Sequence, residues 1–241
     1  QTNALAFAGQ TPTNTTATEE YDGSSWATGG TFPSANYRLA GSGNGTAALG
    51  FGGDTPPGAM SAVTAKYDGT SWTTTGNMGT ARRSLAAAGS QTAAVTFGGD
   101  ANPPVTNATE EFNSSTNTVT AAAWSSGGAL NTGRYFLAGT GSQTEGIVFG
   151  GYDGGSPTGK TEEYNGSSWT EVGDLGTARY SAGAAGTQTA TLAFGGGPGT
   201  KNESEEFNGS SWSEGDNLNT GRRSIGGTGT QTAGLAFGGF T

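Results

Sequence analysis

The chain has 241 residues, of which 46 are glycine, and it contains neither cysteine nor histidine. Its formal net charge of −9 argues against nucleic-acid binding, where a basic surface supplies most of the affinity. The missing residue types exclude the commonest zinc and copper ligands and a Ser-His-Asp triad, so we expect no metal, no cofactor and no enzymatic activity.

From its first residues, the chain repeats one nine-residue phrase, which is QTAAVTFGG in the third copy. The phenylalanines of the six copies are 44, 46, 52, 45 and 43 residues apart. A strand-rich unit of this length is typical of a propeller blade. We therefore expect an all-β protein with a single β-propeller domain spanning residues 1–241. The copies are Gln1–Gly9, Gly45–Gly53, Gln91–Gly99, Gln143–Gly151, Gln188–Gly196 and Gln231–Gly239.

Each repeat contains four strand-like segments, which we name A, B, C and D. In one repeat these are Arg82–Gly89 (A), Gln91–Gly99 (B), Ala108–Phe112 (C) and the residues around Trp124 (D). Strand B alternates small with large apolar residues and ends in Gly-Gly, where a positive φ allows the chain to leave the strand. Asn-Gly or Asp-Gly follows most C strands and indicates a tight hairpin to D.

Strand C carries two glutamates and then an aromatic residue in every repeat except Ala65-Lys66-Tyr67. Neighbouring side chains of a strand point to opposite faces, so we expect one glutamate to meet an arginine of a neighbouring blade and the other to be solvated. Strand D opens on tryptophan, and a seven-residue insertion precedes Trp124. The regular spacing of Phe and Trp indicates that they form the core between blades.

Strand A has little side-chain bulk, which suits the crowded centre of a propeller with few blades. The count of strands is five A, six B, five C and five D. We predict five blades of four antiparallel strands, closed by exchange of the N- and C-terminal strands, with one B strand displaced or paired with another molecule. The alternative is a six-bladed ring with two defective blades, which would leave unpaired edges.

The order of small strand, B strand ending in Gly-Gly, Glu-x-Tyr/Phe and then Trp resembles the kelch repeat of galactose-oxidase-like propellers. The near-identity of the repeats also resembles tandem propeller segments of marine phage structural proteins. The kelch resemblance implies a propeller but no single function, because the family includes enzymes, scaffolds and adhesins. Copper chemistry of the galactose-oxidase kind is excluded, since it requires cysteine and histidine.

All seven arginines lie where strand A begins, often with a tyrosine beside them. Guanidinium groups bind anions and sugar hydroxyls, and aromatic rings stack on sugar faces, so this ring is a candidate ligand-binding site. The alternative is structural, with each arginine bonded to an acidic C-strand residue or to loop carbonyls. The candidate residues are Arg82, Arg134, Arg179, Arg222, Tyr37, Tyr135 and Tyr180.

The loop between B and C varies most from repeat to repeat and holds seven of the eight prolines. Strand direction places these loops on the same face as the starts of A, and variable loops on a rigid scaffold are where binding usually resides. The seven Asn-x-Ser/Thr sequons are candidate glycosylation sites: Asn14, Asn44, Asn107, Asn113, Asn165, Asn202 and Asn208.

We therefore expect a non-enzymatic binding or structural module on an extracellular or virion surface, with a glycan or cell-surface receptor as partner and no membrane insertion. One alternative is a multivalent lectin with sugar sites between the blades. Another is a filament-forming subunit that self-assembles through the surplus strand. A carboxylate-based glycosidase is the enzymatic alternative.

Overall fold

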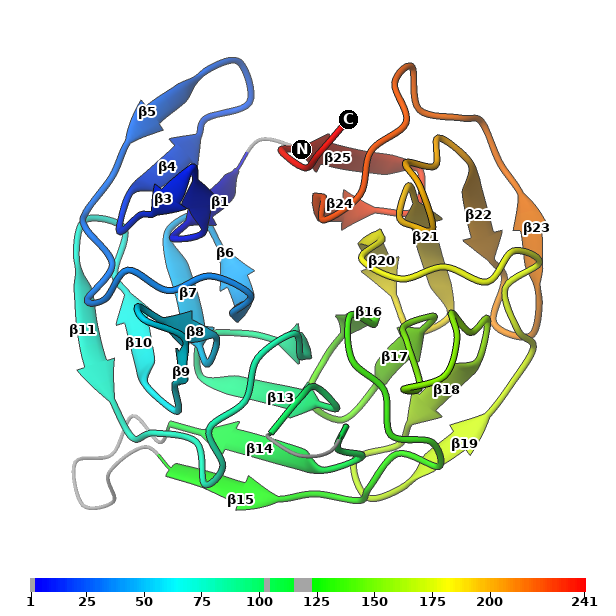
Figure 1. Ribbon diagram of the computed structural model, residues 1–241, viewed down its shortest axis with the longest axis horizontal. Helices are drawn as coiled ribbons and strands as arrows, with labels where there is room; N and C mark the ends of the chain where they lie inside the picture. The colour runs from blue at the N-terminus through cyan, green and yellow to red at the C-terminus, as the bar shows by residue number, and fades with distance from the viewer. Residues whose placement is uncertain (1–2, 102–104, 115–122) are drawn as a thin grey trace.

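The computed structural model describes residues 3–101, 105–114 and 123–241 (Figure 1). It is a five-bladed β-propeller built from antiparallel sheets around a central axis. Three parts of the sequence-based prediction fall outside the described residues. They are the insertion that precedes Trp124, the loop residues Pro103 and Pro104, and the first two residues of the opening phrase.

The first blade has three strands, and the other four blades have four strands each. Strands β1 (Ala4–Phe7), β4 (Thr18–Tyr21) and β5 (Trp26–Thr28) form the first blade. The second consists of β6 (Ala40–Asn44), β7 (Ala47–Phe51), β10 (Thr64–Tyr67) and β11 (Trp72–Thr75), and the third of β12 (Ala86–Gly89), β13 (Ala93–Phe97), β14 (Thr109–Asn113) and β15 (Ala123–Ser126). The fourth consists of β16 (Ala138–Gly141), β17 (Gly146–Phe149), β18 (Thr161–Tyr164) and β19 (Trp169–Glu171), and the fifth of β20 (Gly183–Thr187), β21 (Ala190–Phe194), β22 (Ser204–Phe207) and β23 (Trp212–Glu214).

Smaller sheets complete the described structure. Two B–C loops each contain a short two-stranded ribbon. One ribbon consists of β2 (Gln10–Thr11) and β3 (Thr13–Asn14), and the other of β8 (Asp54–Thr55) and β9 (Ala59–Met60). Strands β24 (Gly226–Thr230) and β25 (Ala233–Phe237) pair with each other after the fifth blade. No helix among the described residues is long and apolar enough to span a membrane.

The predicted repeat of four strands is confirmed, and the observed strands are shorter than the sequence segments from which they were predicted. The A segment expected over Arg82–Gly89 becomes a strand only at Ala86. The reason is Ser84, whose φ of +53° is incompatible with continuous extended structure. The same bend therefore precedes the innermost strand in each repeat. Its positive φ lies at Arg38, Ser84, Phe136, Ser181 and Ser224.

The bends are tied to one another around the axis. The amide of Ser84 donates to the carbonyl of Arg38 at 2.8 Å, and the amide of Phe136 donates to the carbonyl of Ser84 at 2.9 Å. Ser181 and Ser224 continue the series, each at 2.8 Å from the carbonyl before it. The small A strands thus lie at the centre, as predicted, where close approach of backbones leaves little room for side chains (Figure 1).

The core between blades consists of phenylalanine and tryptophan, as predicted. The tryptophan of one blade packs on the B-strand phenylalanine of the preceding blade, with ring centroids 4.7–5.1 Å apart, in the pairs Phe7–Trp72, Phe51–Trp124, Phe97–Trp169 and Phe149–Trp212. The indole N–H of each of these tryptophans donates to a threonine of that same preceding blade, at 2.9–3.1 Å.

The two ends of the chain meet at a seam. There, β24–β25 lies between the fifth and first blades and contacts β20 of the fifth (Figure 1). Of the two B strands that the prediction left as possibly surplus, β1 pairs with β4 in the first blade and β25 pairs with β24. Closure by pairing of terminal strands between the first and last sheets stays a prediction.

Candidate functional site

In three blades, the first arginine of the A segment is held inside its own blade. Arg134 is fully buried, and its guanidinium donates to the carbonyls of Gly150 at 2.8 Å and Lys160 at 2.7 Å and to Glu162 at 2.6 Å. Arg82 and Arg179 repeat this set with Glu110 and Glu205, while Arg222 donates to the carbonyl of Gly238 at 3.1 Å. Three of the four candidate arginines therefore tie strands B and C to the start of A, with their side chains away from solvent.

The second blade lacks both halves of this ion pair. Asn36 stands in the arginine position and donates to the carbonyl of Gly52 at 2.8 Å. Ala65, which lies opposite Gly50 of strand B, stands in the position that Glu110 occupies opposite Thr96 in the third blade. The two changes together remove a buried cation and its anion, because either one alone would leave an unpaired charge.

In two blades, the second glutamate of the C strand meets the next blade instead of solvent. The hydroxyl of Tyr164 donates to Glu111 at 2.5 Å, and that of Tyr67 donates to Glu20. These two bonds join consecutive blades through their C strands. The expected ion pair between blades is wrong, because the pair lies within one blade. The second glutamate is exposed, as expected, only at Glu206.

One residue further along, the backbone of each A segment forms a β-bridge to the residue that follows the Gly-Gly of strand B, and we call this end of the central axis the mouth. The pairs are Tyr37–Asp54, Arg83–Asp100, Tyr135–Tyr152, Tyr180–Gly197 and Arg223–Phe240. The predicted placement of the B–C loops beside the starts of A is therefore correct. The mouth so formed has a charged part and an aromatic part.

The charged part is a network of two arginines and two aspartates. Arg83 donates to Asp100 at 2.8 and 2.9 Å, and lies 3.3 Å from the fully buried carboxylate of Asp54. The hydrogen bond to Asp100 and the charge of Asp54 raise the pKa of Arg83 above its ordinary value. Arg38 lies 3.6 Å from Asp54, with 40% of its side chain exposed.

The aromatic part consists of Tyr135, Phe136, Tyr152 and Tyr180. The ring of Tyr152 lies 5.5 Å from Tyr135 and 5.9 Å from Tyr180, and Phe136 lies 5.0 Å from Tyr135. Burial, with the nearby Tyr152 and Asp100, raises the pKa of the Tyr135 phenol. At neutral pH this phenol therefore keeps its proton and is available as a donor.

Arg38 and Phe136 connect the two parts. The guanidinium carbon of Arg38 lies 5.0 Å from the ring centre of Tyr37 and 5.8 Å from that of Phe136. Both residues have a positive φ, 58° and 54°, at a position where the other three bends carry serine. A bulky residue in this conformation is strained, and such strain is concentrated at functional sites.

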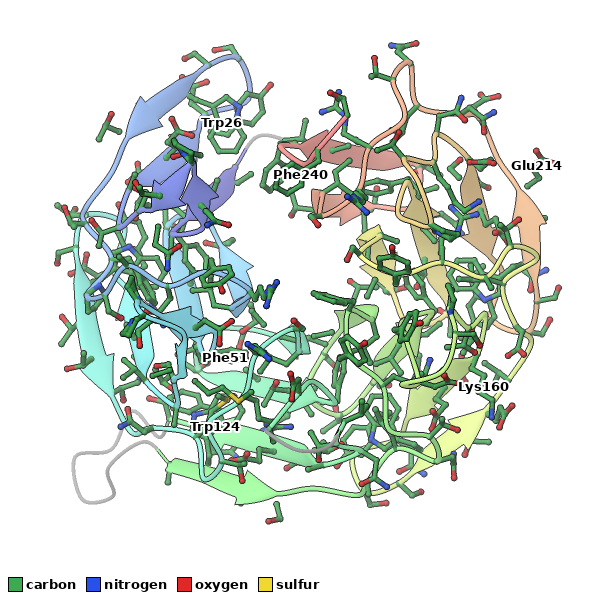
Figure 2. The ribbon with its side chains drawn as sticks, viewed as in Figure 1. Trp26, Phe51, Trp124, Lys160, Glu214 and Phe240 are labelled. Carbon is green, nitrogen blue, oxygen red and sulfur yellow. The ribbon has the colours of Figure 1, made fainter. Side chains whose placement is uncertain are left out.

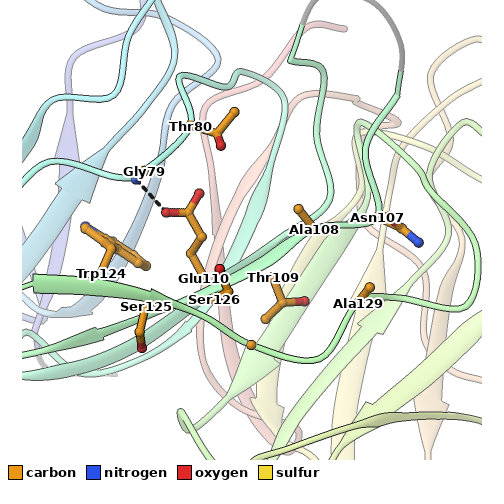
Figure 3. A pocket seen from close by; sticks show the side chains of 11 residues that line it. Gly79, Thr80, Asn107, Ala108, Thr109, Glu110, Trp124, Ser125, Ser126 and Ala129 are labelled. Carbon is orange, nitrogen blue, oxygen red and sulfur yellow. Dashed lines mark hydrogen bonds between the residues drawn. The ribbon is translucent and has the colours of Figure 1, made fainter.

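A pocket of about 470 Å³ lies at the outer side of the third blade, between Gly79, Glu110 and Trp124 (Figure 3). The carboxylate of Glu110 enters it with both oxygens engaged, one by Arg82 at 2.7 Å and the other by the amide of Gly79 at 2.6 Å. Glu111, the other acid of the pair, is bonded to Tyr164 of the next blade. This pocket therefore does not hold the two facing carboxylates that a glycosidase needs.

Sequence reasoning placed Tyr37, Tyr135 and Tyr180 at the mouth, and the structure brings them there. Arg38 belongs to the predicted ring of arginines but was not singled out as a candidate. The roles of Phe136, Tyr152, Asp54 and Asp100 were not predicted. The sequence did contain one sign of the structural role of the first arginine. In the second blade, arginine and the C-strand glutamate are both absent, at Asn36 and Ala65, as expected if the two residues form a pair. Among the described residues, no group of three acidic side chains could hold a metal ion.

Comparisons with protein-family models and with curated proteins find no match to this chain. The residues of the mouth are therefore the basis for assigning a function.

Proposed function

We propose that this protein is a non-enzymatic binding propeller that recognises a saccharide at the mouth formed by the starts of A and the B–C loops. The observation that carries this proposal is the meeting of Arg38 and Phe136, both with positive φ, beside Tyr135, Tyr152 and Tyr180.

The chemistry of the mouth suits a sugar. Specific small-ligand sites combine apolar surface with a few placed polar groups. Half-buried aromatic rings offer flat faces to the C–H groups of a pyranose. The hydroxyls of Tyr135 and Tyr180 can donate hydrogen bonds to a sugar, while that of Tyr152 donates to the carbonyl of Gly155 at 3.1 Å. Arg38 and the Arg83–Asp100 pair add charged donors and acceptors for hydroxyl or carboxylate groups.

Binding to a glycan array by the wild-type protein and Phe136→Ser tests the proposal. Serine already occupies this position at Ser84, Ser181 and Ser224, so the substitution keeps a backbone that the fold accepts. We expect wild-type binding to a group of related saccharides and a loss of about tenfold or more in the variant, which corresponds to about 1.4 kcal/mol.

The matched control is Glu214→Ser on the outer strand β23, which should bind as the wild type does. Arg38→Ser repeats the test on the other side of the mouth. Equal binding by Phe136→Ser and the wild type would refute the assignment of the site, and the absence of any saccharide ligand would refute the function.

A further inference from the structure

The pocket at the outer side of the third blade lies beside a glycine where the fourth blade has an asparagine. The carboxylate of Glu110 points into this pocket, Trp124 stands at its side, and the loop that enters the blade borders it at Gly79 (Figure 3). Gly79 and Asn131 each stand three residues before the buried arginine of their blade. The two positions are therefore equivalent, and the side chain of Asn131 shows which chemical group suits this place.

In the fourth blade, Asn131 is bound through its side-chain nitrogen. That nitrogen donates to Glu162 at 2.9 Å and to the backbone carbonyl of Trp169 at 3.2 Å. The backbone amide of Asn131 donates to the same oxygen of Glu162 at 2.7 Å. Both hydrogens of one carboxamide NH₂ group are therefore received, one by a carboxylate oxygen and one by a carbonyl oxygen.

The third blade presents the same carboxylate without the side chain. One oxygen of Glu110 is bound by Arg82 at 2.7 Å, and the other accepts the amide of Gly79 at 2.6 Å. A carboxylate oxygen can accept two hydrogen bonds, as the equivalent oxygen of Glu162 does. The second oxygen of Glu110 can therefore receive one further donor from the pocket.

The backbone carbonyl of Trp124 is the other acceptor. The amide of Gly127 donates to Thr109 at 2.8 Å, and the bonds of an antiparallel ladder fall at alternate residues, so the ladder leaves out Trp124. The register is the same in the fourth blade, where the carbonyl of Trp169 receives Asn131. Within the described part of the chain, no donor reaches the carbonyl of Trp124.

These groups are open to solvent and firmly held. Glu110 keeps 7% of its surface exposed, against 1% for Glu162, and Trp124 is half-buried whereas Trp169 is buried. The ring of Trp124 packs on Phe51 of the second blade, with ring centroids 5.0 Å apart (Figure 2). A ligand can therefore reach the two acceptors, whose positions are fixed by the core between the blades.

The charge of the pocket favours a neutral ligand group. Arg82 is fully buried and lies 2.7 Å from Glu110, so it already balances the carboxylate. A cationic ligand would bring an unbalanced charge beside the buried arginine, whereas a carboxamide supplies two donors and no charge. Asn131 provides such a group in the fourth blade.

We propose that the pocket beside Gly79 is a second binding site, distinct from the mouth, for a ligand that presents a primary carboxamide. The two hydrogens of the ligand NH₂ group donate to Glu110 and to the carbonyl of Trp124. The volume of about 470 Å³ is that of a small-molecule site. It has room for a free amide or for an asparagine or glutamine side chain of a partner protein.

Titration of the full chain with propanamide, followed by NMR of the backbone amides, tests the site. We expect saturable shift changes at Gly79, Glu110 and Ser125, with a dissociation constant on the order of millimolar, as for other ligands of few atoms. N-methylpropanamide keeps one N–H and N,N-dimethylpropanamide has none, so affinity should fall in that order. Absence of saturable changes, or equal binding of the dimethyl compound, would overturn the proposal.

Gly79→Asn is the variant that should close the site, because it copies the fourth blade. An added Cβ at Gly79 would meet only the carboxylate of Glu110, at 3.1 Å, so the fold has room for a side chain. The new carboxamide should abolish the propanamide shifts and raise the denaturation midpoint. The matched control is Gly176→Asn at the same position of the fifth blade, which should leave the shifts at Gly79 unchanged. Undiminished binding by Gly79→Asn would contradict the proposal.

Asn131→Gly is the reverse substitution and should open an equivalent site in the fourth blade. We expect propanamide to produce a second set of shifts, at Glu162 and Trp169, which this substitution leaves without the carboxamide. The absence of that second set would contradict the equivalence of the two positions, from which the ligand class is inferred.

A blocked peptide, acetyl-Ala-Gln-Ala-N-methylamide, distinguishes the two sources of the amide. Tighter binding than that of propanamide, lost when glutamate replaces the glutamine, would support the proposal with a partner protein as the source. Binding no tighter than that of propanamide would support it with a free small amide as the source. Equal binding of the glutamine and glutamate peptides at the pocket would overturn the assignment of the carboxamide.

Discussion

The buried arginine at the start of strand A determines how strands B and C are joined in three blades. Its guanidinium satisfies two carbonyls and one carboxylate, which all lie away from water. A buried ion pair of this kind adds little stability relative to a well-packed apolar pair, but removal of one member is expensive. In the second blade both members of the pair are replaced, by Asn36 and Ala65, so that no buried charge is left unpaired.

This comparison gives a prediction for the fourth blade. Arg134→Asn alone should lower the free energy of unfolding by about 3–5 kcal/mol, because Glu162, which is 1% exposed, would lose its buried partner. Arg134→Asn with Glu162→Ala, which copies Asn36 and Ala65, should recover much of that loss. Urea denaturation of the single and double variants measures both. A double variant less stable than either single would contradict this explanation.

Glu163 is a half-buried C-strand glutamate whose next blade has phenylalanine where Tyr67 and Tyr164 stand in theirs. Phe207 occupies the place where Tyr67 and Tyr164 donate, and one buried oxygen of Glu163 has no partner among the described residues. Burial raises the pKa of Glu163 above its ordinary value. Phe207→Tyr should therefore add one hydrogen bond and about 1 kcal/mol of stability at pH 7.

The same residue predicts a pH dependence. Because its pKa is higher in the folded than in the unfolded state, ionised Glu163 destabilises the fold, and this penalty disappears as pH falls through the raised pKa towards the ordinary value. Glu163→Gln should remove that contribution. Thermal melts of both proteins between neutral and acidic pH measure the difference, and parallel curves would contradict the assignment.

At the scale of the strand, the sequence predicts which segments pair but not where each one bends. Alternation and Asn-Gly or Asp-Gly turns identify the hairpins, and the observed registers follow them. The bend before β16 was not predicted, because Phe136 is an unusual residue for a positive φ. Consecutive residues there also point in different directions, so Arg134 is buried while Tyr135 reaches the mouth.

The Gly-Gly that ends strand B gives a prediction at this scale. Gly150 has a φ of +62°, and an added Cβ would lie 2.4 Å from the carbonyl oxygen of Arg179. Gly150→Ala should therefore lower stability by well over 1 kcal/mol. Gly146→Ala, at the other end of β17, is the control, because its Cβ would find contacts of 3.5 Å or more. Equal denaturation midpoints for the two variants would contradict this role.

At the scale of the whole molecule, the repeat period and the inventory of strands were sufficient to predict five blades, small inner strands and an aromatic core between blades. The pairing of β24 with β25, and the mouth residues other than the predicted tyrosines and arginines, could not be predicted, because both arise from differences between repeats. Asp54, Asp100 and Tyr152 occupy one position of three B–C loops and become neighbours only when the ring forms.

One ring should present one binding mouth. Titration calorimetry with the best saccharide from the array tests this through the number of sites per chain. We expect one site, with affinity reduced in Phe136→Ser. Four or five equivalent sites per chain, unaffected by that substitution, would contradict it and would place the sugar between the blades.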